Sequence, residues 1–523
     1  MRTTAHAITE QLTVLGADLM FGVPGESYLA VLDALHDTSA IRFITCRQEG
    51  GAAFAAEAAG KLTGRPGVVM VTRGPGATNA AIGIHTAQQD ETPLLIFVGQ
   101  VPRHQRGRDA FQELDLAAVF GSMCKWVHEL DDAQRAPDVV ARAWSLTTSG
   151  RPGPVMIGLP EDMLTEQCDA AVVAPGPSPA SSVSAGTVGA IRALLDAAER
   201  PLVIVGGSRW SDAASDQLPR SFAGVPVVTA FRRQDLVDHR LASFAGSLGI
   251  GADPALLARV HAADVVVCIG DRLDDSTTNG FTLLDTSGQR AALVHVHPDP
   301  NELGRVFTPR LSVAAAPEAF LDALGIVPTQ QRWADWLAHA RTGYVAWRNT
   351  EGLLDDVVRG LRLMLPDDAI VTNGAGNFTR PVQRSFAFGR PGRHLAPISG
   401  AMGYGLPAAM AAKVVHPDRV VVCVAGDGDL LMTSQELATI ARLGLGVVVL
   451  VVDNSSYGTI RTHQERRYPG RPFATALTNP DFVEFAHSFG MRAERTTTAA
   501  ETIDALQRGV ASGVASLVHL VTD

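Results

Sequence analysis

The stretch that decides the fold begins Val420-Val-Val-Cys-Val-Ala-Gly-Asp-Gly-Asp429 and ends Gly446-Val-Val-Val-Leu-Val-Val-Asp-Asn-Ser-Ser-Tyr-Gly458. Each end holds a continuous apolar run rich in β-branched residues, as is typical of buried parallel strands. Between them, apolar residues recur at helical spacing from Leu430 to Leu443, and Gly444 follows as a stop signal. The stretch therefore predicts a strand–turn–helix–strand unit of a parallel α/β sheet.

Polar residues follow both of these strands. In open parallel sheets, ligands bind at the carboxyl ends of the strands. Asp427 and Asn454 follow neighbouring strands and supply hard oxygen ligands within reach of one Mg²⁺. Gly426 and Gly428 let backbone amides approach an anion at the amino end of the following helix. The sequence thus predicts a diphosphate bridged by Mg²⁺ to Asp427 and Asn454.

Composition narrows the class of protein. The chain has 523 residues, of which 46% are hydrophobic and 19% charged, so it can bury the cores of about three domains. A net charge of −10 gives no basic footprint for nucleic acid or an anionic membrane. The first residues lack the long apolar core of a signal peptide and no apolar run reaches about 18 residues, so we expect neither a signal peptide nor a membrane span. The five scattered cysteines have no metal-binding spacing, and we expect a cytoplasmic protein.

Helical and strand patterns alternate along three blocks, which predicts an α/β fold with three doubly wound parallel-sheet domains. We place the domains at residues 1–165, 186–328 and 350–523, with a proline-rich linker in 151–185 after Pro160. Alanine-rich helices near Lys61 and Lys413 are each followed, at the same spacing, by a valine-rich strand and a glycine turn. This internal echo suggests that the first and third domains are related.

The spacing of 25 residues between Gly428 and Asn454 resembles the thiamine diphosphate motif of the acetohydroxyacid synthase and 2-oxo acid decarboxylase superfamily. The resemblance covers nearly the whole chain. It implies a pyrimidine-binding first domain, a central Rossmann-like domain and a diphosphate-binding third domain. It also implies thiamine diphosphate and Mg²⁺ as cofactors, with the backbone carbonyl of Ser456 as the third protein ligand of the metal.

Two further motifs carry the resemblance. Arg47-Gln-Glu-Gly-Gly-Ala-Ala53 is similar to the family's Arg-His-Glu-Gln-Gly-Ala-Ala, which implies that Glu49 binds the pyrimidine ring. Ser399-Gly-Ala-Met-Gly-Tyr-Gly-Leu-Pro407 is similar to a family motif that holds the cofactor bent. Gly400 would then accept the 4′-amino group and Met402 would wedge beneath the cofactor. The alternatives are that Glu49 only caps a helix and that Met402 only fills the core.

The resemblance implies further contacts to the cofactor. Asn373-Gly-Ala-Gly-Asn377 follows a strand, and we expect Asn373 and Asn377 to line the diphosphate pocket together with Asp429 and Tyr457. In this family, Glu49 of one chain serves the metal anchor of another chain. The resemblance therefore implies a homodimer or homotetramer with active sites at the subunit interface.

Several positions depart from the synthase pattern. Synthases carry Asp-Asp-Arg where this chain has Asp274-Asp275-Ser276, and a hydroxyl cannot replace a bidentate guanidinium. Glu26 replaces a glycine and His463 replaces a tryptophan, which makes both candidate catalytic proton carriers or, alternatively, ordinary surface residues.

Two other positions concern the substrate. The resemblance implies that Gln112 borders it, beside Phe111, although the two could equally be an aromatic residue and a polar neighbour at a helix start. Arg73 could meet an anionic substrate or pair with a surface acid.

The predicted reaction is decarboxylation of a 2-oxo acid and carboligation to a second carbonyl, such as an aldehyde. Simple decarboxylases carry a glutamate where this chain has Ile460, which favours carboligation over protonation. The alternatives are a simple decarboxylase, a lyase acting on a 2-hydroxy ketone or 2-hydroxyacyl thioester, and a non-catalytic nucleotide-binding homologue. Some synthases hold FAD in the middle domain, but without a specific flavin fingerprint FAD is possible and not favoured.

Overall fold

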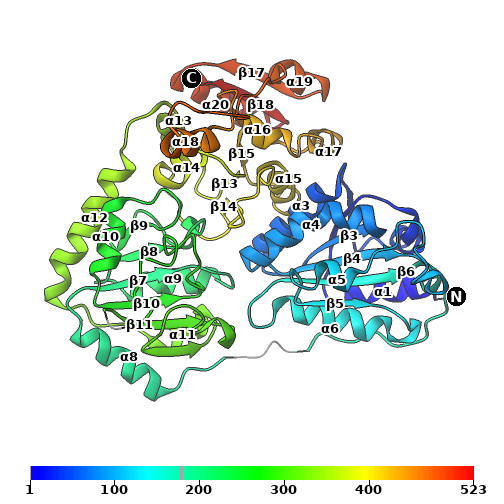
Figure 1. Ribbon diagram of the computed structural model, residues 1–523, viewed down its shortest axis with the longest axis horizontal. Coiled ribbons are helices and arrows are strands. Elements are labelled where there is room, and N and C mark those ends of the chain that lie inside the picture. The colour runs from blue at the N-terminus through cyan, green and yellow to red at the C-terminus, as the bar shows by residue number, and fades with distance from the viewer. Residues whose placement is uncertain (1, 177–180, 289, 523) are drawn as a thin grey trace.

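The computed structural model describes residues 2–176, 181–288 and 290–522, so residues 177–180 of the predicted linker lie outside the described residues. The described chain forms three lobes, each built on a six-stranded parallel sheet (Figure 1). The predicted α/β class with three parallel-sheet units is confirmed. The domain limits themselves remain predictions, and each sheet lies within one of the three predicted ranges.

The first lobe holds the strand order β2-β1-β3-β4-β6-β5. Its strands are β1 (Leu19–Gly22), β2 (Arg42–Thr45), β3 (Gly67–Thr72), β4 (Leu94–Gln100), β5 (Trp126–Glu129) and β6 (Pro154–Pro160). Its helices are α1 (Thr4–Val14), α2 (Leu29–His36), α3 (Glu49–Thr63), α4 (Arg73–Asp90), α5 (Leu116–Phe120), α6 (Ala136–Thr148) and α7 (Glu161–Leu164).

The second lobe holds the order β12-β11-β10-β7-β8-β9. Its strands are β7 (Pro201–Val205), β8 (Val227–Thr229), β9 (Phe244–Ser247), β10 (Val265–Ile269), β11 (Ala292–His297) and β12 (Leu311–Ala314). Its helices are α8 (Ala185–Ala197), α9 (Asp212–Ser221), α10 (Pro254–Ala262), α11 (Pro317–Leu324) and α12 (Ala334–Arg348).

The third lobe holds the order β14-β13-β15-β16-β18-β17, the same pattern as the first. Its strands are β13 (Ile370–Asn373), β14 (His394–Leu395), β15 (Val421–Gly426), β16 (Val447–Asp453), β17 (Arg492–Thr496) and β18 (Ser516–Val521). Its helices are α13 (Leu353–Met364), α14 (Thr379–Ser385), α15 (Gly405–Val415), α16 (Asp427–Leu431), α17 (Glu436–Arg442), α18 (Gly458–Arg467), α19 (Phe482–Ser488) and α20 (Ala499–Ser512).

The deciding stretch forms the centre of the third sheet. β15 and β16 are buried along their whole length, which is why both read as continuous apolar runs. They pair in parallel with Gly426 opposite Val452, so Asp427 and Asn454 leave the sheet at the same edge. The helix predicted between them is divided into α16 and α17 by a turn at residues 432–435, where the Thr433 hydroxyl donates to the carbonyl of Gly403, 2.7 Å away.

The first and third lobes share one apolar core. It runs from a face of the first sheet through α3 and α15 to a face of the third sheet. Both helices are rich in alanine, and small side chains allow their axes to approach closely. Figure 1 shows α3 and α15 side by side where the two lobes meet. None of the helices of the described chain is long and apolar enough to cross a membrane.

A buried charged cluster joins the first and second lobes. Glu91, which follows α4, lies 3.6 Å from His297 and 3.5 Å from Arg151, as ion pairs beyond hydrogen-bonding distance. Burial alone would raise the pKa of Glu91, but His297, Arg151 and Arg272 lower it to about 2. Burial would lower the pKa of His297, but Glu91 raises it above its ordinary value. The cluster therefore holds charged groups at the contact between these lobes.

Replacing Glu91 by Gln should lower stability by about 3–5 kcal/mol, because His297 stays buried without its counter-charge and Arg151 keeps only Glu302, 3.0 Å away. The stability that ionised Glu91 contributes is fully present above its ordinary pKa of 4.5 and is lost as the pH falls toward 2. The stability that protonated His297 contributes is fully present below its ordinary pKa of 6.5 and is lost as the pH rises through its raised pKa in the folded protein. The loss in melting temperature should therefore be largest between about pH 5 and 6.5.

Thermal unfolding across pH measures this effect, with Glu10→Gln as the matched control. Glu10 pairs with Arg2 at the surface, so its loss should cost below about 1 kcal/mol. Equal shifts for the two variants would contradict a stabilising role of the buried cluster.

Candidate active site

A cavity of about 630 Å³ opens at the carboxyl ends of β13, β15 and β16, where the strand order of the third sheet reverses. This is the position at which open parallel sheets bind ligands. All its described lining residues belong to the third lobe. Ten residues that the sequence nominated line it together: Asn377, Gly400, Met402, Gly426, Asp427, Gly428, Asp429, Asn454, Ser456 and Tyr457.

Asp427 begins α16 and is almost fully buried. Its Oδ2 accepts a hydrogen bond from Nδ2 of Asn479 at 2.8 Å, and the same nitrogen donates to Oδ1 of Asp453 at 2.8 Å. Burial raises the pKa of Asp427, and the nearby charge of Asp453 raises it further. Two carboxylates thus share one amide donor at the cavity, an arrangement that a bound cation would stabilise.

The loop after β16 presents Asn454 and Ser456. Ser455 takes a left-handed backbone conformation with φ of 49°, and its N–H donates to Oδ1 of Asp453 at 2.8 Å. The Oδ1 of Asn454 accepts from the N–H of Ser456 at 3.2 Å. The loop therefore turns sharply enough to bring Asn454 and Ser456 to the same cavity as Asp427.

The glycines of the turn are needed for close packing. A Cβ added at Gly426 would lie 2.8 Å from the ring of Phe378, and one at Gly428 would lie 2.8 Å from the ring of Tyr457. These contacts leave no space for any side chain at either position. The predicted approach of its backbone amides to a bound anion remains a prediction, and it depends on this tight turn.

Asp429 connects the glycine turn to the segment that carries Gly400 and Met402. Its Oδ1 accepts hydrogen bonds from the N–H groups of Gly403 at 2.9 Å and Ala375 at 3.0 Å. Burial raises the pKa of Asp429 to about 7, although these two hydrogen bonds and the charge of Arg232 lower it. In this structure, Asp429 therefore positions neighbouring loops as well as lining the cavity.

The two asparagines at the end of β13 differ. Asn377 lines the cavity, and its Nδ2 lies 3.4 Å from Oγ1 of Thr462. Asn373 is fully buried and does not reach the described lining, because its amide donates to the carbonyl of Gly374 and its Oδ1 accepts from Nε2 of His394. The structure thus gives Asn373 a place beneath the cavity.

Glu49 lies in the first lobe, outside the cavity of the same chain. It occupies the first turn of α3, but the side chain that caps this helix is that of Gln48, whose Oε1 accepts from the N–H of Gly51. The carboxylate of Glu49 accepts from Nδ2 of Asn79 at 2.9 Å and is partly exposed. It therefore remains available to a ligand.

Glu26 and Gln112 share the end of the first sheet that also carries Glu49. Glu26 is exposed at the turn after β1, and the carbonyl of Gln112 accepts from the N–H of Gly74 at the start of α4. Arg73 pairs with Glu161 at 2.6 Å, which is the surface pairing considered from the sequence. All these groups follow carboxyl ends of first-sheet strands, so they form one polar surface.

The α18 helix carries Ile460 and His463, the two positions that the sequence analysis singled out there, and their surroundings differ. Ile460 lines the cavity, whereas His463 is exposed outside the described lining. Nδ1 of His463 accepts a hydrogen bond from Arg466 at 2.6 Å. The structure therefore does not bring His463, Glu26 or Gln112 into contact with Asp427 within one chain.

Two residues that the sequence did not nominate position the site. The fully buried Oε1 of Glu436 accepts from the N–H groups of Arg47 and Gln48 at 3.0 and 3.1 Å, which fixes the backbone immediately before Glu49. Asn479 joins Asp427 to Asp453. Neither belongs to a local motif, since their partners come from distant parts of the chain, so only a fold could reveal them.

The donor set suits magnesium. A carboxylate oxygen from Asp427, an amide oxygen from Asn454 and a backbone carbonyl from Ser456 are hard oxygen ligands. The described chain holds no group of three or more His, Cys, Asp or Glu residues able to bind a metal. With a single carboxylate in the set, the remaining positions around Mg²⁺ would be left to phosphate oxygens and water.

Removing the amide of Asn479 should weaken magnesium binding. Asn479→Ala leaves the carboxylates of Asp427 and Asp453 without their shared donor, so we expect about 10–100-fold lower affinity for Mg²⁺. Titration of activity with Mg²⁺ at fixed cofactor measures the change. Asn301→Ala is the control, because the Asn301 side chain donates to Asp299 in the second lobe and, among the described residues, to no other group. An unchanged Mg²⁺ requirement would show that Asn479 does not support the metal site.

Comparisons with known proteins agree with this geometry. Family models match the N-terminal TPP binding domain of thiamine pyrophosphate enzymes at residues 2–119, the central domain at 188–324 and the C-terminal TPP binding domain at 374–520. An acetolactate synthase large subunit of Parasynechococcus marenigrum is 35% identical over 94% of this chain and 83% of its own length.

Two further relatives are similar along almost the whole chain. The large subunit of acetolactate synthase isozyme 2 of Escherichia coli is 30% identical over 99% of this chain and 95% of its own length. A probable acetolactate synthase large subunit of Methanocaldococcus jannaschii is also 30% identical, over 99% of this chain and 92% of its own length. The chain therefore belongs to the thiamine pyrophosphate enzyme family, in the acetolactate synthase group of enzymes that form carbon–carbon bonds.

Proposed function

We propose that the protein decarboxylates a 2-oxo acid and joins the remaining carbon unit to a second carbonyl compound, with thiamine diphosphate and Mg²⁺. The observation that carries this proposal is the single cavity that gathers the turn at Asp427, the loop at Asn454 and the segment of Gly400 and Met402. When bound, thiamine diphosphate supplies the carbon nucleophile and the electron sink for decarboxylation.

The residues of the cavity divide the binding task. Asp427, Asn454 and the carbonyl of Ser456, which line the cavity, would hold Mg²⁺, while the backbone amides of the turn at Gly426–Gly428 would bind the diphosphate. Gly400, with φ of 69°, would accept the amino group of the pyrimidine, and Met402 would fill the space beneath the cofactor. Glu49 would hold or release a proton at the pyrimidine nitrogen.

The position of Glu49 supports a site shared between two chains. Within one chain, no described residue of the first lobe lines the cavity. Large apolar side chains lie exposed on both halves, including Leu29 and Phe111 in the first lobe and Met432 and Ile460 in the third. A second copy that set its first lobe against this cavity would bury them and complete the site. We therefore propose a homodimer, or a homotetramer made of two such dimers.

The apolar side chain of Ile460 supports carboligation over protonation. It lines the cavity and has no proton to give to a reaction intermediate. Any acceptor must find its anchor elsewhere than at Ser276, because a hydroxyl cannot form the paired hydrogen bonds of a guanidinium with a carboxylate. We therefore favour an uncharged carbonyl acceptor, such as an aldehyde.

We propose that the protein works without FAD. The strand order of the second sheet reverses between β7 and β10, where a dinucleotide would bind. The loops that follow these strands touch there: a Cβ at Gly207 would lie 1.8 Å from the carbonyl of Gly270, and one at Gly206 would lie 2.2 Å from Oδ2 of Asp271. Purified protein should lack visible flavin absorbance, and a flavin spectrum would contradict this proposal.

A substrate screen tests the proposed function. Purified protein with added thiamine diphosphate and Mg²⁺ is given 2-oxo acids alone and in pairs with aldehydes, and both carbon dioxide and products are measured. We expect carbon dioxide release together with a 2-hydroxy ketone. Recovery of only free aldehyde would instead indicate a simple decarboxylase, and cleavage of 2-hydroxy ketones without carbon dioxide would indicate a lyase.

A further inference from the structure

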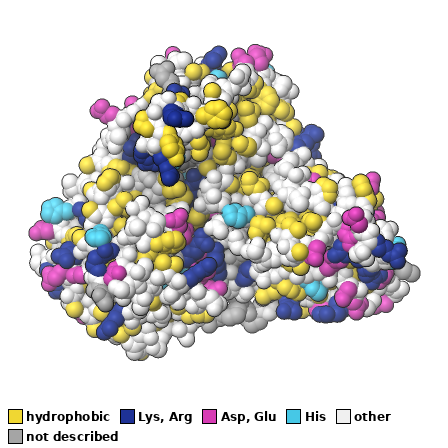
Figure 2. All heavy atoms as spheres, viewed as in Figure 1, with side chains coloured by type: hydrophobic (Ala, Val, Ile, Leu, Met, Phe, Trp, Pro, Cys, Tyr) yellow, Lys and Arg dark blue, Asp and Glu magenta, His cyan; other side chains and the backbone are white. Residues whose placement is uncertain are grey.

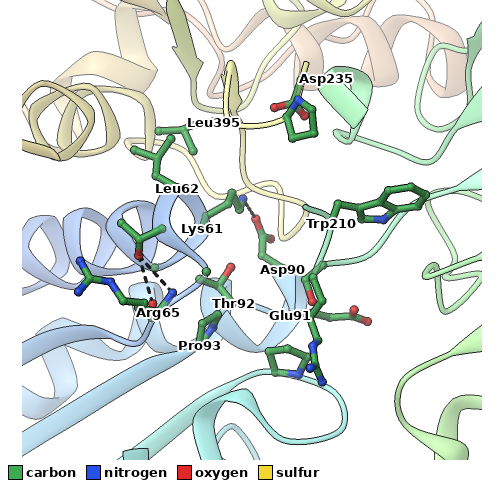
Figure 3. A pocket seen from close by; sticks show the side chains of 18 of the residues that line it. Lys61, Leu62, Arg65, Asp90, Glu91, Thr92, Pro93, Trp210, Asp235 and Leu395 are labelled. Atoms are coloured by element: carbon green, nitrogen blue, oxygen red, sulfur yellow. Dashed lines mark hydrogen bonds and ion pairs between the residues drawn. The ribbon is translucent and has the colours of Figure 1, made fainter. Parts of the chain in front are cut away.

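A second cavity, of about 540 Å³, lies where all three lobes meet. It is lined by the end of α3, the loop after β7 and the segments before β14 and β15. The first-lobe and third-lobe segments precede their strands, so they lie at the amino ends of the first and third sheets, opposite the candidate active site. Figure 2 shows Lys and Arg side chains gathered in the hollow between the lobes, and Figure 3 shows part of the lining. The proposed function does not use this cavity.

The acids in its lining are already engaged. Asp90 pairs with Lys61, as Figure 3 shows, and its Oδ1 accepts from the N–H of Ile398 at 2.7 Å. Oδ2 of Asp235 accepts from the backbone of Arg393 and His394 at 3.0 and 3.1 Å. Glu91 belongs to the interlobe cluster described above. Among the lining acids of the described chain, only Asp212 is left without a hydrogen bond or ion pair.

The lining has more cations than these acids can neutralise. In the described chain, the side chains of Arg209 and Arg419 make no hydrogen bond and no ion pair. Arg393 donates only to the backbone carbonyls of Pro391 and Gly392, and its Nε has no acceptor. The positive charge of these side chains also acts on His416: burial lowers the pKa of its imidazole, and Arg419 and Arg393 lower it further. Besides the buried Arg233, which donates to the backbone carbonyl of Asp90, three guanidinium groups thus line the cavity without a hydrogen bond to an acid, and a single lining acid is uncommitted.

The chemistry of these groups selects the ligand. Guanidinium groups bind phosphate and carboxylate oxygens through paired hydrogen bonds, and phosphates gain most from several of them. The volume lies within the range of about 300–1,000 Å³ that is typical of small-molecule sites. The indole of Trp210 also lines the cavity, with Nε1 held by the carbonyl of Gly206 at 2.8 Å, and offers an apolar wall beside the cations.

We infer that this junction cavity is a binding site for a small phosphorylated molecule, held by Arg209 of the second lobe and by Arg393 and Arg419 of the third. Such a ligand would add a second link between the second and third lobes, which already meet here where the N–H groups of Arg393 and His394 donate to Asp235. Binding should therefore raise the stability of the whole chain by mass action. The site is separate from the diphosphate anchor at Asp427 and Asn454.

The test uses the holoenzyme, saturated with thiamine diphosphate and Mg²⁺ so that the catalytic cavity is closed to other phosphates. Calorimetric titration and thermal unfolding are run with inorganic phosphate, fructose 1,6-bisphosphate and, as a carboxylate polyanion, citrate. We expect saturable binding of the bisphosphate with a rise in melting temperature. The double variant Arg393→Gln/Arg419→Gln should bind at least about 10-fold more weakly, because two of three guanidinium groups are lost.

Arg492→Gln on the exposed edge strand β17 is the matched control and should bind as the unchanged protein does. Unfolding of each variant without ligand verifies that it is folded, and Arg209→Gln in the second lobe provides an independent variant. The inference is overturned if neither phosphate compound binds, if citrate alone binds, or if the arginine variants bind the bisphosphate as tightly as the control.

Discussion

Glu49→Gln should lower kcat by about 10²–10⁴-fold while leaving cofactor binding nearly intact. The amide keeps the size of the side chain and its contact with Asn79, but it cannot exchange a proton with the pyrimidine ring. Because Gln48 caps α3, the change should not disturb the helix. Steady-state rates with saturating cofactor, together with cofactor titration, separate the two effects. Turnover equal to that of the unchanged protein would show that Glu49 has only a structural role.

The same variant tests whether the site is shared between chains. Glu49→Gln and Asp427→Asn should each be inactive alone. Mixed dimers would contain one site with both original residues, so random mixing should restore about a quarter of the activity if each site takes Glu49 and Asp427 from different chains. If both residues of a site came from one chain, mixing would restore nothing.

Asp427→Asn should weaken binding of thiamine diphosphate with Mg²⁺ by about 100-fold or more, since it removes the only carboxylate of the proposed metal site. It also removes an acceptor for Asn479. Cofactor binding is measured by titration of the apo protein at several Mg²⁺ concentrations. Chelation of Mg²⁺ should abolish activity of the unchanged protein, and added Mg²⁺ should restore it.

Asp429→Asn is the matched control two residues away. The N–H groups of Ala375 and Gly403 both donate to the same oxygen of Asp429, Oδ1, and an asparagine side chain retains this oxygen. Its effect on cofactor affinity should therefore stay below about 10-fold, because no proposed metal ligand is lost. Comparable losses in the two variants would contradict the assignment of the metal to Asp427.

The local sequence pattern was sufficient to predict the strands and the glycine turn around the site. The apolar runs at 420–424 and 447–452 form β15 and β16, and Gly426 and Gly428 close a turn too tight for side chains. The single helix predicted between the strands was wrong in one respect, because the turn at Thr433 divides it. Periodicity cannot show such a break, since the bond to Gly403 joins residues 30 positions apart.

The sequence by itself determined the parallel strands, the acidic glycine turn and the family motifs, because each depends on residues that are neighbours in the chain or on one face of an element. Only the tertiary structure decided which groups meet. It set Asn479 between Asp427 and Asp453, fixed the backbone before Glu49 with Glu436, and moved Asn373 beneath the cavity. It also gathered Arg209, Arg393 and Arg419 at the junction of the lobes. These contacts join residues far apart in sequence, so packing alone sets their distances and their burial.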